Sequence, residues 1–259
     1  MHRNLALLCT LTVTAFGEAV AQRTAATDIA DSARIEIDAA TAAGDGVRLN
    51  KAIAYLERAA VAHPKDAWIS HYLGFAYYRA VNAARGQSDS KRVNELLDLS
   101  LAALDKSNAA MPLAETHALR SAVLGQMIAA SSNPLKGMTV GPKADKAMDA
   151  ALALGPKNPR VWVIRASSVL YKPKLFGGSV EKAEEYARKA IELLASDNPI
   201  SPSPRWGESD AYLFLGQALA GQKKHNEAKA AYERVLALEP GNGYVTYVLM
   251  PALRKQMGQ

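Results

Sequence analysis

The sequence predicts an all-α fold, and three observations carry that prediction. Alanine is abundant and β-branched clusters are few, which favours helices because alanine loses no side-chain entropy on entering one. Apolar residues recur at three- and four-residue spacings, the period of an amphipathic helix. The periodic stretches come in pairs separated by turn-forming residues, as in helical hairpins. With 259 residues, 49% of them hydrophobic, the chain is long enough to bury a substantial core.

The first 21 residues differ from the rest and predict a secretory signal peptide. Arg3 gives a short positive start, residues 5–17 are apolar, and Ala19-Val20-Ala21 supplies small residues at a cleavage site. The apolar run is too short to span a bilayer, which needs roughly 20 residues, and no later stretch is apolar enough. We therefore expect cleavage after Ala21, one mature domain over residues 22–259, and a periplasmic location, with secretion as the alternative.

The single cysteine and the pattern of charges limit which kinds of site and partner we expect. Cys9 follows two leucines, where a lipoprotein signal would have a small residue, so lipidation is not expected. Cleavage would remove this only cysteine, leaving no disulfide, thiol nucleophile or cysteine-bound metal. The net charge of +6 is scattered among charges of both signs, which is typical of a solvated surface. Attraction to anionic envelope polymers stays open, whereas nucleic-acid binding is not expected.

The clearest repeat unit runs from Ser209 to Asn242. Its apolar residues form two periodic stretches, and the segment between them is polar. The unit resembles the tetratricopeptide repeat, because suitable residues stand at its characteristic places: Tyr212, Leu215-Gly216, Ala228, Tyr232 and Pro240. A second stretch, Ala52 to Tyr77, fits the same pattern across Pro64.

This resemblance and the periodicity together predict a right-handed α-solenoid of about five helical hairpins. The expected hairpins cover residues 25–63, 66–108, 113–154, 159–195 and 208–238. A last helix, 244–256, would cap the apolar face of the fifth hairpin, since a terminal repeat otherwise leaves that face in water. Pro251 should end or kink this helix.

Three Pro/Gly-rich segments depart from the regular pattern: 133–142, 171–178 and 197–207. We expect them to be loops, because such residues interrupt helices, and loops on a regular scaffold often carry function. Together with Asn158–Val161 and Leu249–Pro251, these segments resemble an exported bacterial tetratricopeptide family of largely undefined function. That resemblance implies a compartment and a fold, but no reaction.

The tetratricopeptide resemblance also implies which residues line a concave groove. In the second hairpin the groove positions fall on an aromatic and cationic set: Trp68, His71, Phe75, Tyr78 and Arg79. In the fourth and fifth they fall on Arg160, Val163, Ser167, Leu170, Tyr171, Asp210, Leu213, Gln217, Ala220 and Gly221. Aromatic faces and a bidentate arginine could clasp an extended peptide or a sugar chain. Alternatively, some of these aromatics pack against the neighbouring helix.

Two loop aromatics are further candidates. Phe176 and Trp206 could form one aromatic lip at an end of the array. The structural alternative, which we favour, is that Trp206 fills the gap between hairpins. In that interpretation Gly177-Gly178 permits a positive-φ turn before a helix capped by Ser179.

Nothing in the sequence indicates catalysis. The five histidines lack a second His or an acid at metal-ligand spacing on one helix face, and no nucleophile motif is present. Carboxylates should pair with lysines on solvated faces, as in Glu181-Lys182 and Glu184-Lys189. Neither a metal nor a cofactor is expected, although distant carboxylates that converge in space could still form an acid pair.

The leading hypothesis is therefore a non-enzymatic periplasmic scaffold or adaptor that binds a protein or peptide partner in its groove. The alternative is a binding protein for a small molecule or envelope polymer, such as a glycan, and a transport accessory is one form of it. An open groove favours the first hypothesis, and a closed pocket lined by Trp68, His71 and Tyr78 favours the second.

Overall fold

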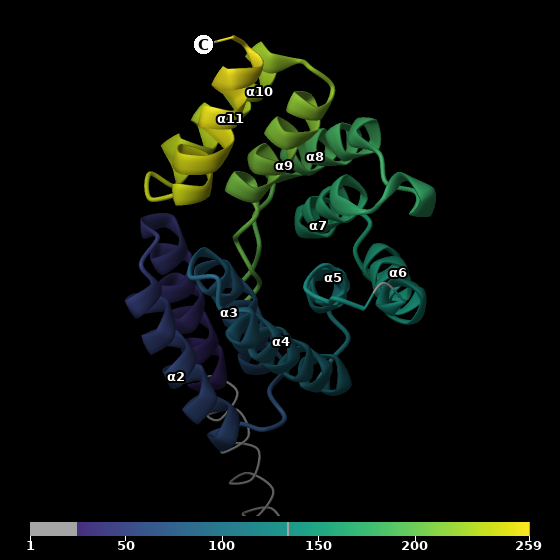
Figure 1. Cartoon of the computed structure of the whole chain (residues 1–259). Coiled ribbons are helices and arrows are strands. Elements are labelled where there is room, and N and C mark those ends of the chain that lie inside the picture. The colour runs from purple at the N-terminus through teal and green to yellow at the C-terminus, as the bar shows by residue number, and fades with distance from the viewer. Residues whose placement is uncertain (1–24, 134, 259) are drawn as a thin grey trace, which may run out of the picture.

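The computed structural model describes residues 25–133 and 135–258, and every regular element in those ranges is a helix (Figure 1). The all-α prediction is thus confirmed. The predicted signal peptide and its cleavage site lie outside the described residues. The helices are residues 25–43, α2 (Gly46–Ala62), α3 (Ala67–Gly86), α4 (Ser90–Ala110), α5 (Ala114–Ala129), α6 (Lys136–Leu154), α7 (Pro159–Tyr171), α8 (Val180–Leu194), α9 (Glu208–Gly221), α10 (His225–Leu238) and α11 (Met250–Gln256).

The helices pair into consecutive hairpins, close to the predicted ranges. Within each pair the helices pack against each other: α3 with α4, α5 with α6, α7 with α8, and α9 with α10. Five of the helices begin at a side-chain cap whose oxygen accepts a backbone N–H, namely Asp45, Asp66, Asp89, Asn158 and Ser179. Such a cap stabilises a helix by about 1 kcal/mol. The predicted role of Ser179 is confirmed.

The C-terminal repeat shows why its pattern of small residues is needed. A Cβ placed on Gly216 would lie 2.4 Å from the ring of Tyr232, so only glycine lets α9 and α10 approach this closely. Ala228 is fully buried in the same interface. The spacing of small and aromatic residues therefore fixes the distance between the two helices of the hairpin.

One predicted loop is wrong. Residues 133–142 do not form a loop throughout, because α6 begins at Lys136 and continues through Pro142. The residue before a proline normally avoids helix, since its Cβ and backbone N–H clash with the proline ring. Gly141 has no Cβ, which removes part of that clash. Pro142 is the seventh residue of α6, so its missing N–H costs the helix one backbone hydrogen bond, to the carbonyl of Met138.

The C-terminal cap forms as predicted, with a local distortion at its proline. A π-helical turn, Val245–Leu249, precedes α11, and Pro251 lies in the first turn of α11. Proline has no N–H and its ring crowds the carbonyl four residues earlier, so the preceding turn widens. The buried residues Val245, Met250 and Leu253 of this segment join the core.

The hairpins follow one another around a curve (Figure 1). The first helices of successive hairpins, α3, α5, α7 and α9, pack against one another along its inner side, and their partners lie outside. The curve brings the two ends of the array together. The backbone N–H of Gly241, after α10, donates to the carbonyl oxygen of Ala42 in the first hairpin at 3.3 Å.

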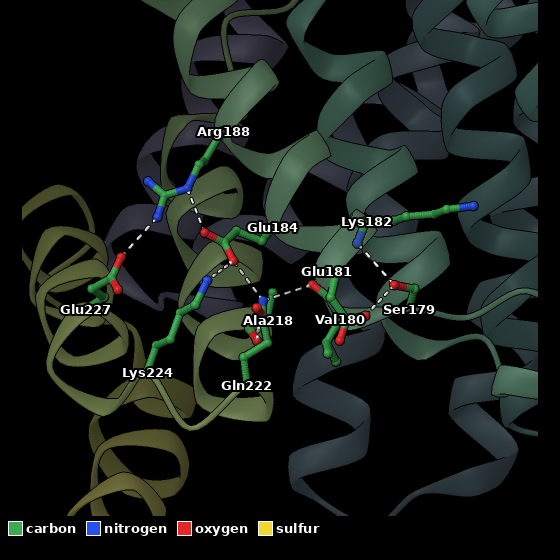
Figure 2. Close-up of polar contacts among 10 residues, drawn as sticks. All are labelled: Ser179, Val180, Glu181, Lys182, Glu184, Arg188, Ala218, Gln222, Lys224 and Glu227. Atoms are coloured by element: carbon green, nitrogen blue, oxygen red, sulfur yellow. Dashed lines mark hydrogen bonds and ion pairs between the residues drawn. The ribbon is translucent and has the colours of Figure 1, made fainter.

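On the outer side, a polar network joins the fourth and fifth hairpins (Figure 2). Glu184 of α8 accepts from Arg188 at 2.9 Å, from Lys224 at 2.8 Å and from Gln222 at 2.8 Å. Burial opposes the charge of Glu184, but these three donors outweigh it and lower its pKa to about 2. The predicted Glu184–Lys189 pairing is therefore wrong, because the carboxylate points toward the next hairpin.

Glu181 and Lys189 also have partners other than the predicted ones. Glu181 accepts from the hydroxyl of its neighbour Ser179 at 2.6 Å, in place of the predicted pairing with Lys182. Lys189 pairs with Glu192 at 3.1 Å on the same helix. The sequence identified the acidic and basic residues of α8, but which of them form pairs depends on how the hairpins stack.

Candidate functional site

The inner side of the curve is partly occupied by the chain itself. The segment between α8 and α9, residues 195–207, is named the strap here, and it runs beside α3 toward the interior (Figure 1). It contains three prolines and no helix. Its backbone makes a turn in which the N–H of Ser203 donates to the carbonyl oxygen of Ile200 at 2.8 Å, but most of its polar groups need partners elsewhere. Side chains of the inner helices supply the missing contacts.

Three contacts with α3 and α7 hold the strap at successive points. Arg160 of α7, whose side chain is 2% exposed, pairs with Asp197 at 2.6 Å. The hydroxyl of Tyr72 on α3 donates to the carbonyl oxygen of Pro202. Trp206 stacks on Phe75 of α3 with ring centroids 5.2 Å apart and an interplanar angle of 18°. The strap therefore binds its own inner face through an acidic group, a backbone carbonyl and an aromatic anchor.

An ion pair between α3 and α9 lies just beyond the C-terminal end of the strap. Arg79 of α3 forms a bidentate pair with Asp210 of α9, at 2.8 and 2.6 Å, and its guanidinium lies 4.9 Å from the centre of the Phe75 ring. Burial disfavours the charge of Arg79, but Asp210 outweighs burial and raises its pKa. Removing one partner would leave a buried, uncompensated charge.

We call this part of the inner side the filled half: the strap together with Tyr72, Phe75, Arg79 and Arg160. Three of the predicted groove residues, Phe75, Arg79 and Arg160, belong to it. His71 is buried between α3 and α5, and Trp68 packs half-buried beside Tyr72. With the strap in place, His71 and Phe75 have almost no accessible surface. A role for these five in partner binding stays a prediction.

His71 is buried as a neutral ring. Its Nδ1 lies 2.9 Å from the hydroxyl oxygen of Thr116, and its Nε2 has no hydrogen-bond partner in the described part of the chain. Burial lowers the pKa of His71 to about 3. In this structure the ring is therefore part of the packing between α3 and α5.

The remaining part of the inner side is open. We call it the open half: Tyr78 of α3, Gln126 of α5, Tyr171 of α7 and Gln217 of α9. Tyr171 is 58% exposed, yet burial raises its pKa, and nearby tyrosines such as Tyr78 add to the rise. The exposed ring of Tyr171 thus lies between inner helices, bonded to Gln217 of α9 and close to Tyr78 of α3. Tyr78 and Tyr171 were predicted to line the groove.

The open half contains two tyrosine–glutamine pairs. The hydroxyl of Tyr171 donates to Oε1 of Gln217 at 2.8 Å. A hydrogen bond from Gln126 to the hydroxyl of Tyr78 opposes the rise that burial causes in the Tyr78 pKa. Each pair leaves one amide atom without a partner in the described residues: Oε1 of Gln126, an acceptor, and Nε2 of Gln217, a donor.

The two loop aromatics lie in different environments. Trp206 is 7% exposed and fills the space over Phe75, as the structural alternative expected. Phe176 is 62% exposed and ends a short 3₁₀ turn, followed by Gly177 at φ +91°. Because Trp206 is buried, it does not contribute an exposed ring to a lip with Phe176.

Sequence reasoning missed three residues that matter here. Gln126 could have been found, because counting from the Leu124-Gly125 pair in the third hairpin places it at the same groove position as Gln217. Tyr72 and Asp197 had no such signal. Their roles follow from the path of the strap, which no periodic pattern specifies.

The described residues contain no group of three or more His, Cys, Asp or Glu side chains placed to hold a metal ion. In that same part of the chain, no helix has the length and apolar character needed to cross a membrane.

The architecture defines an α-solenoid of helical hairpins with a concave inner side, a class in which the inner side is the usual contact surface. Residues 209–242 match the tetratricopeptide repeat family. The chain therefore contains one matched tetratricopeptide repeat inside a larger array of similar hairpins, and its overall fold resembles that of tetratricopeptide proteins.

Two solved structures support this fold. The first is TTC0263, a thermophilic tetratricopeptide protein of Thermus thermophilus. Its TM-score is 0.58 at 15% identity, and the match covers 84% of this chain and 98% of that one. The second is the HusA haemophore of Porphyromonas gingivalis. Its TM-score is 0.56 at 24% identity, covering 71% of this chain and 92% of that one. No curated protein sequence matches the chain.

Proposed function

We propose that the protein is a non-enzymatic scaffold or adaptor that holds a protein or peptide partner on its open half. The tetratricopeptide fold supports protein-interaction scaffolding in general. The observation that carries the proposal for this surface is the pair of unpartnered amide atoms on Gln126 and Gln217.

A peptide group has one donor, its N–H, and one acceptor, its C=O. The free acceptor on Gln126 and the free donor on Gln217 complement these two groups. Both atoms have little accessible surface, so a partner would meet them after a rotation of the terminal amide. The rings of Tyr78 and Tyr171 would add contact area at a low cost in side-chain entropy.

The strap supports the same proposal from within the molecule. It is an extended segment held on the inner side by Tyr72, Phe75 and Arg160, through a carbonyl, an aromatic ring and a carboxylate. The inner side of this array is therefore chemically suited to extended backbone. The open half offers the same helices without an occupant from the described part of the chain.

We further propose that this binding takes place in the periplasm. The support is the N-terminal sequence, with Arg3, an apolar run over residues 5–17 and Ala19-Val20-Ala21. A fusion of residues 1–24 to a reporter that is active only after export would test this. Reporter activity outside the cytoplasm is expected, and its absence together with an uncleaved fusion would contradict the location.

Site-directed photo-crosslinking tests the scaffold proposal. A benzophenone amino acid at position 171 should crosslink a defined protein or peptide from envelope extract, and Gln217→Ala should reduce that yield at least threefold. The same probe at position 55, a surface tyrosine on α2, is the matched control and should not capture that partner. Equal capture from both positions, or capture unaffected by Gln217→Ala, would contradict the proposal.

The alternative is a binding protein for a small molecule or an envelope polymer. One similar fold belongs to a protein named as a haemophore, so haem is the first ligand to test. Absorbance titration with haemin should give a saturable 1:1 spectral change, weakened by Tyr171→Phe, if this alternative holds. An unchanged spectrum together with position-specific crosslinking would favour the scaffold.

A further inference from the structure

A cavity of about 190 Å³ lies where the two ends of the array meet. Four segments that are distant in sequence line it: the helix 25–43, α3, the junction of the strap with α9, and the end of α10. It is separate from the open half, and the proposal below does not depend on the proposed function. We name it the closure cavity.

The charges around the closure cavity are unevenly compensated. Among its acidic residues, Asp210 is neutralised by Arg79, and Glu208 by Arg234 at 2.7 Å. Asp38 has only a longer contact with Arg34, at 3.7 Å, and Glu239 accepts from the neutral amide of Asn242 at 2.9 Å. The lining also contains Arg205, which is exposed to solvent and can therefore be screened or turn outward.

Burial raises the pKa of both Asp38 and Glu239, and the positive charge of Arg79 opposes both rises. Arg34 and Arg160 add to this opposition at Asp38, and hydrogen bonds from Asn242 and Ser209 add to it at Glu239. Asp210 adds like-charge repulsion to each of them. These two carboxylates are thus less well compensated than their neighbours. A cation placed between the ends of the array would stabilise their charged forms.

A second, independent observation concerns Trp206. Its side chain is 7% exposed and lines the cavity, and its indole Nε1 is buried without a hydrogen-bond partner in the described residues. The hydroxyl oxygen of Thr41, also in the lining, is unpartnered in the same way. The lining therefore contains an unused donor beside acceptors, and because this N–H has almost no accessible surface, a ligand would meet it after a small movement of the indole. A simple monatomic cation would satisfy the acceptors and leave the donor unpaired.

We propose that the closure cavity binds a primary ammonium group that carries a hydrogen-bond acceptor on the neighbouring carbon. The ammonium faces the carboxylates of Asp38 and Glu239, and the acceptor receives the indole N–H of Trp206. An ammonium group has three donors and no acceptor, which matches a carboxylate-rich lining. Both a free amino alcohol and the amino terminus of a peptide have this chemistry.

Because the lining comes from both ends of the array, binding should also stabilise their contact. Any ligand that binds the folded state alone raises the unfolding temperature in a concentration-dependent way. Thermal unfolding therefore reports on occupancy without a labelled ligand.

The test uses the whole chain and three small probes: ethanolamine, ethylamine and N-acetylethanolamine. Calorimetric titration should show binding of ethanolamine, at least fivefold weaker binding of ethylamine, and no binding of the neutral N-acetyl compound. Asp38→Asn and Glu239→Gln should each weaken ethanolamine binding at least tenfold. The matched control is Glu233→Gln, an exposed carboxylate on α10 paired with Lys229, which should leave the affinity unchanged.

A second variant distinguishes a loss of ligand contacts from a folding defect. Trp206→Phe keeps an aromatic ring over Phe75 but removes the indole N–H, so it should abolish the preference for ethanolamine over ethylamine. Glycine amide and a tripeptide amide then separate the two sources: binding of both supports a peptide amino terminus, and binding of ethanolamine alone supports a free amine. No amine binding by the parent chain, or equal binding by Asp38→Asn, would overturn the proposal.

Discussion

The filled half and the open half are built by the same inner helices and differ in what covers them. On the filled half, Phe75 and Arg160 meet a tryptophan and an aspartate of the strap. On the open half, Tyr171 and Gln217 meet each other, and the tyrosine stays 58% exposed. The comparison shows that one solenoid surface can serve as core or as contact surface, depending on whether a connecting segment is long enough to cover it.

The largest expected effect comes from removing the aromatic anchor of the strap. Trp206→Ala deletes a buried ring stacked on Phe75, and such a truncation costs about 3–5 kcal/mol in a core. We expect a correspondingly lower free energy of unfolding in urea. Phe176→Ala, at a ring that is 62% exposed, is the matched control and should change stability by less than about 0.5 kcal/mol. Similar losses in the two variants would show that the strap is not part of the core.

The next effect is acid destabilisation through His71, which is buried between α3 and α5. Its folded pKa of about 3 lies below the ordinary value of 6.5, so the unfolded state binds the proton first as the pH falls. Stability should therefore decrease between pH 6.5 and about 3, by up to about 1.4 kcal/mol per pH unit for this proton. Comparing the pH dependence of urea unfolding in the parent and in His71→Asn isolates that contribution.

In His71→Asn the slope over this window should become smaller, even if the variant is less stable at neutral pH. His63→Asn, at the end of α2, serves as the control and should keep the slope of the parent. An unchanged slope in His71→Asn would mean that the ring is accessible to protons in the folded state. The packing between α3 and α5 would then be less closed than the burial of His71 indicates.

The sequence predicted the hairpins well because repeat spacing and packing are local. Gly216 and Ala228 stand where the two helices must approach, and a count along the chain finds them. The strap has no such period, and the contact between Tyr72 and Pro202 joins residues 130 positions apart. The prolines of 197–207 predicted a loop correctly, but only the three-dimensional path shows that this loop covers the predicted groove.

The prediction of a loop where α6 begins was wrong for a different reason. Pro142 and the glycines around it argue against a helix when each residue is judged by its own preference. Packing of the later part of α6 outweighs that preference, because Ala144, Met148 and Ala151 are buried against the neighbouring helices. Tertiary contacts thus extend the helix toward its weak end.

A smaller effect is expected from the tyrosine that holds the strap backbone. Tyr72→Phe removes the hydroxyl that donates to the carbonyl oxygen of Pro202. A buried acceptor left without a donor costs about 1–3 kcal/mol. Hydrogen exchange should show faster opening of residues 198–207 in this variant, while the exchange of α10 should match the parent. Slow exchange of the strap in the variant would indicate that Trp206 and Arg160 hold it without Tyr72.

The smallest effect on stability is expected from the equivalent change on the open half. Tyr171→Phe also removes one hydroxyl and one hydrogen bond, to Gln217, but both groups can be solvated because the tyrosine is 58% exposed. The free energy of unfolding should therefore change by less than about 0.5 kcal/mol, since water replaces the lost partner. Urea unfolding of Tyr72→Phe and Tyr171→Phe side by side measures the contrast directly. If Tyr171→Phe destabilised the chain as much as Tyr72→Phe, the open half would be packed core, and its two tyrosine–glutamine pairs would be unavailable to a partner.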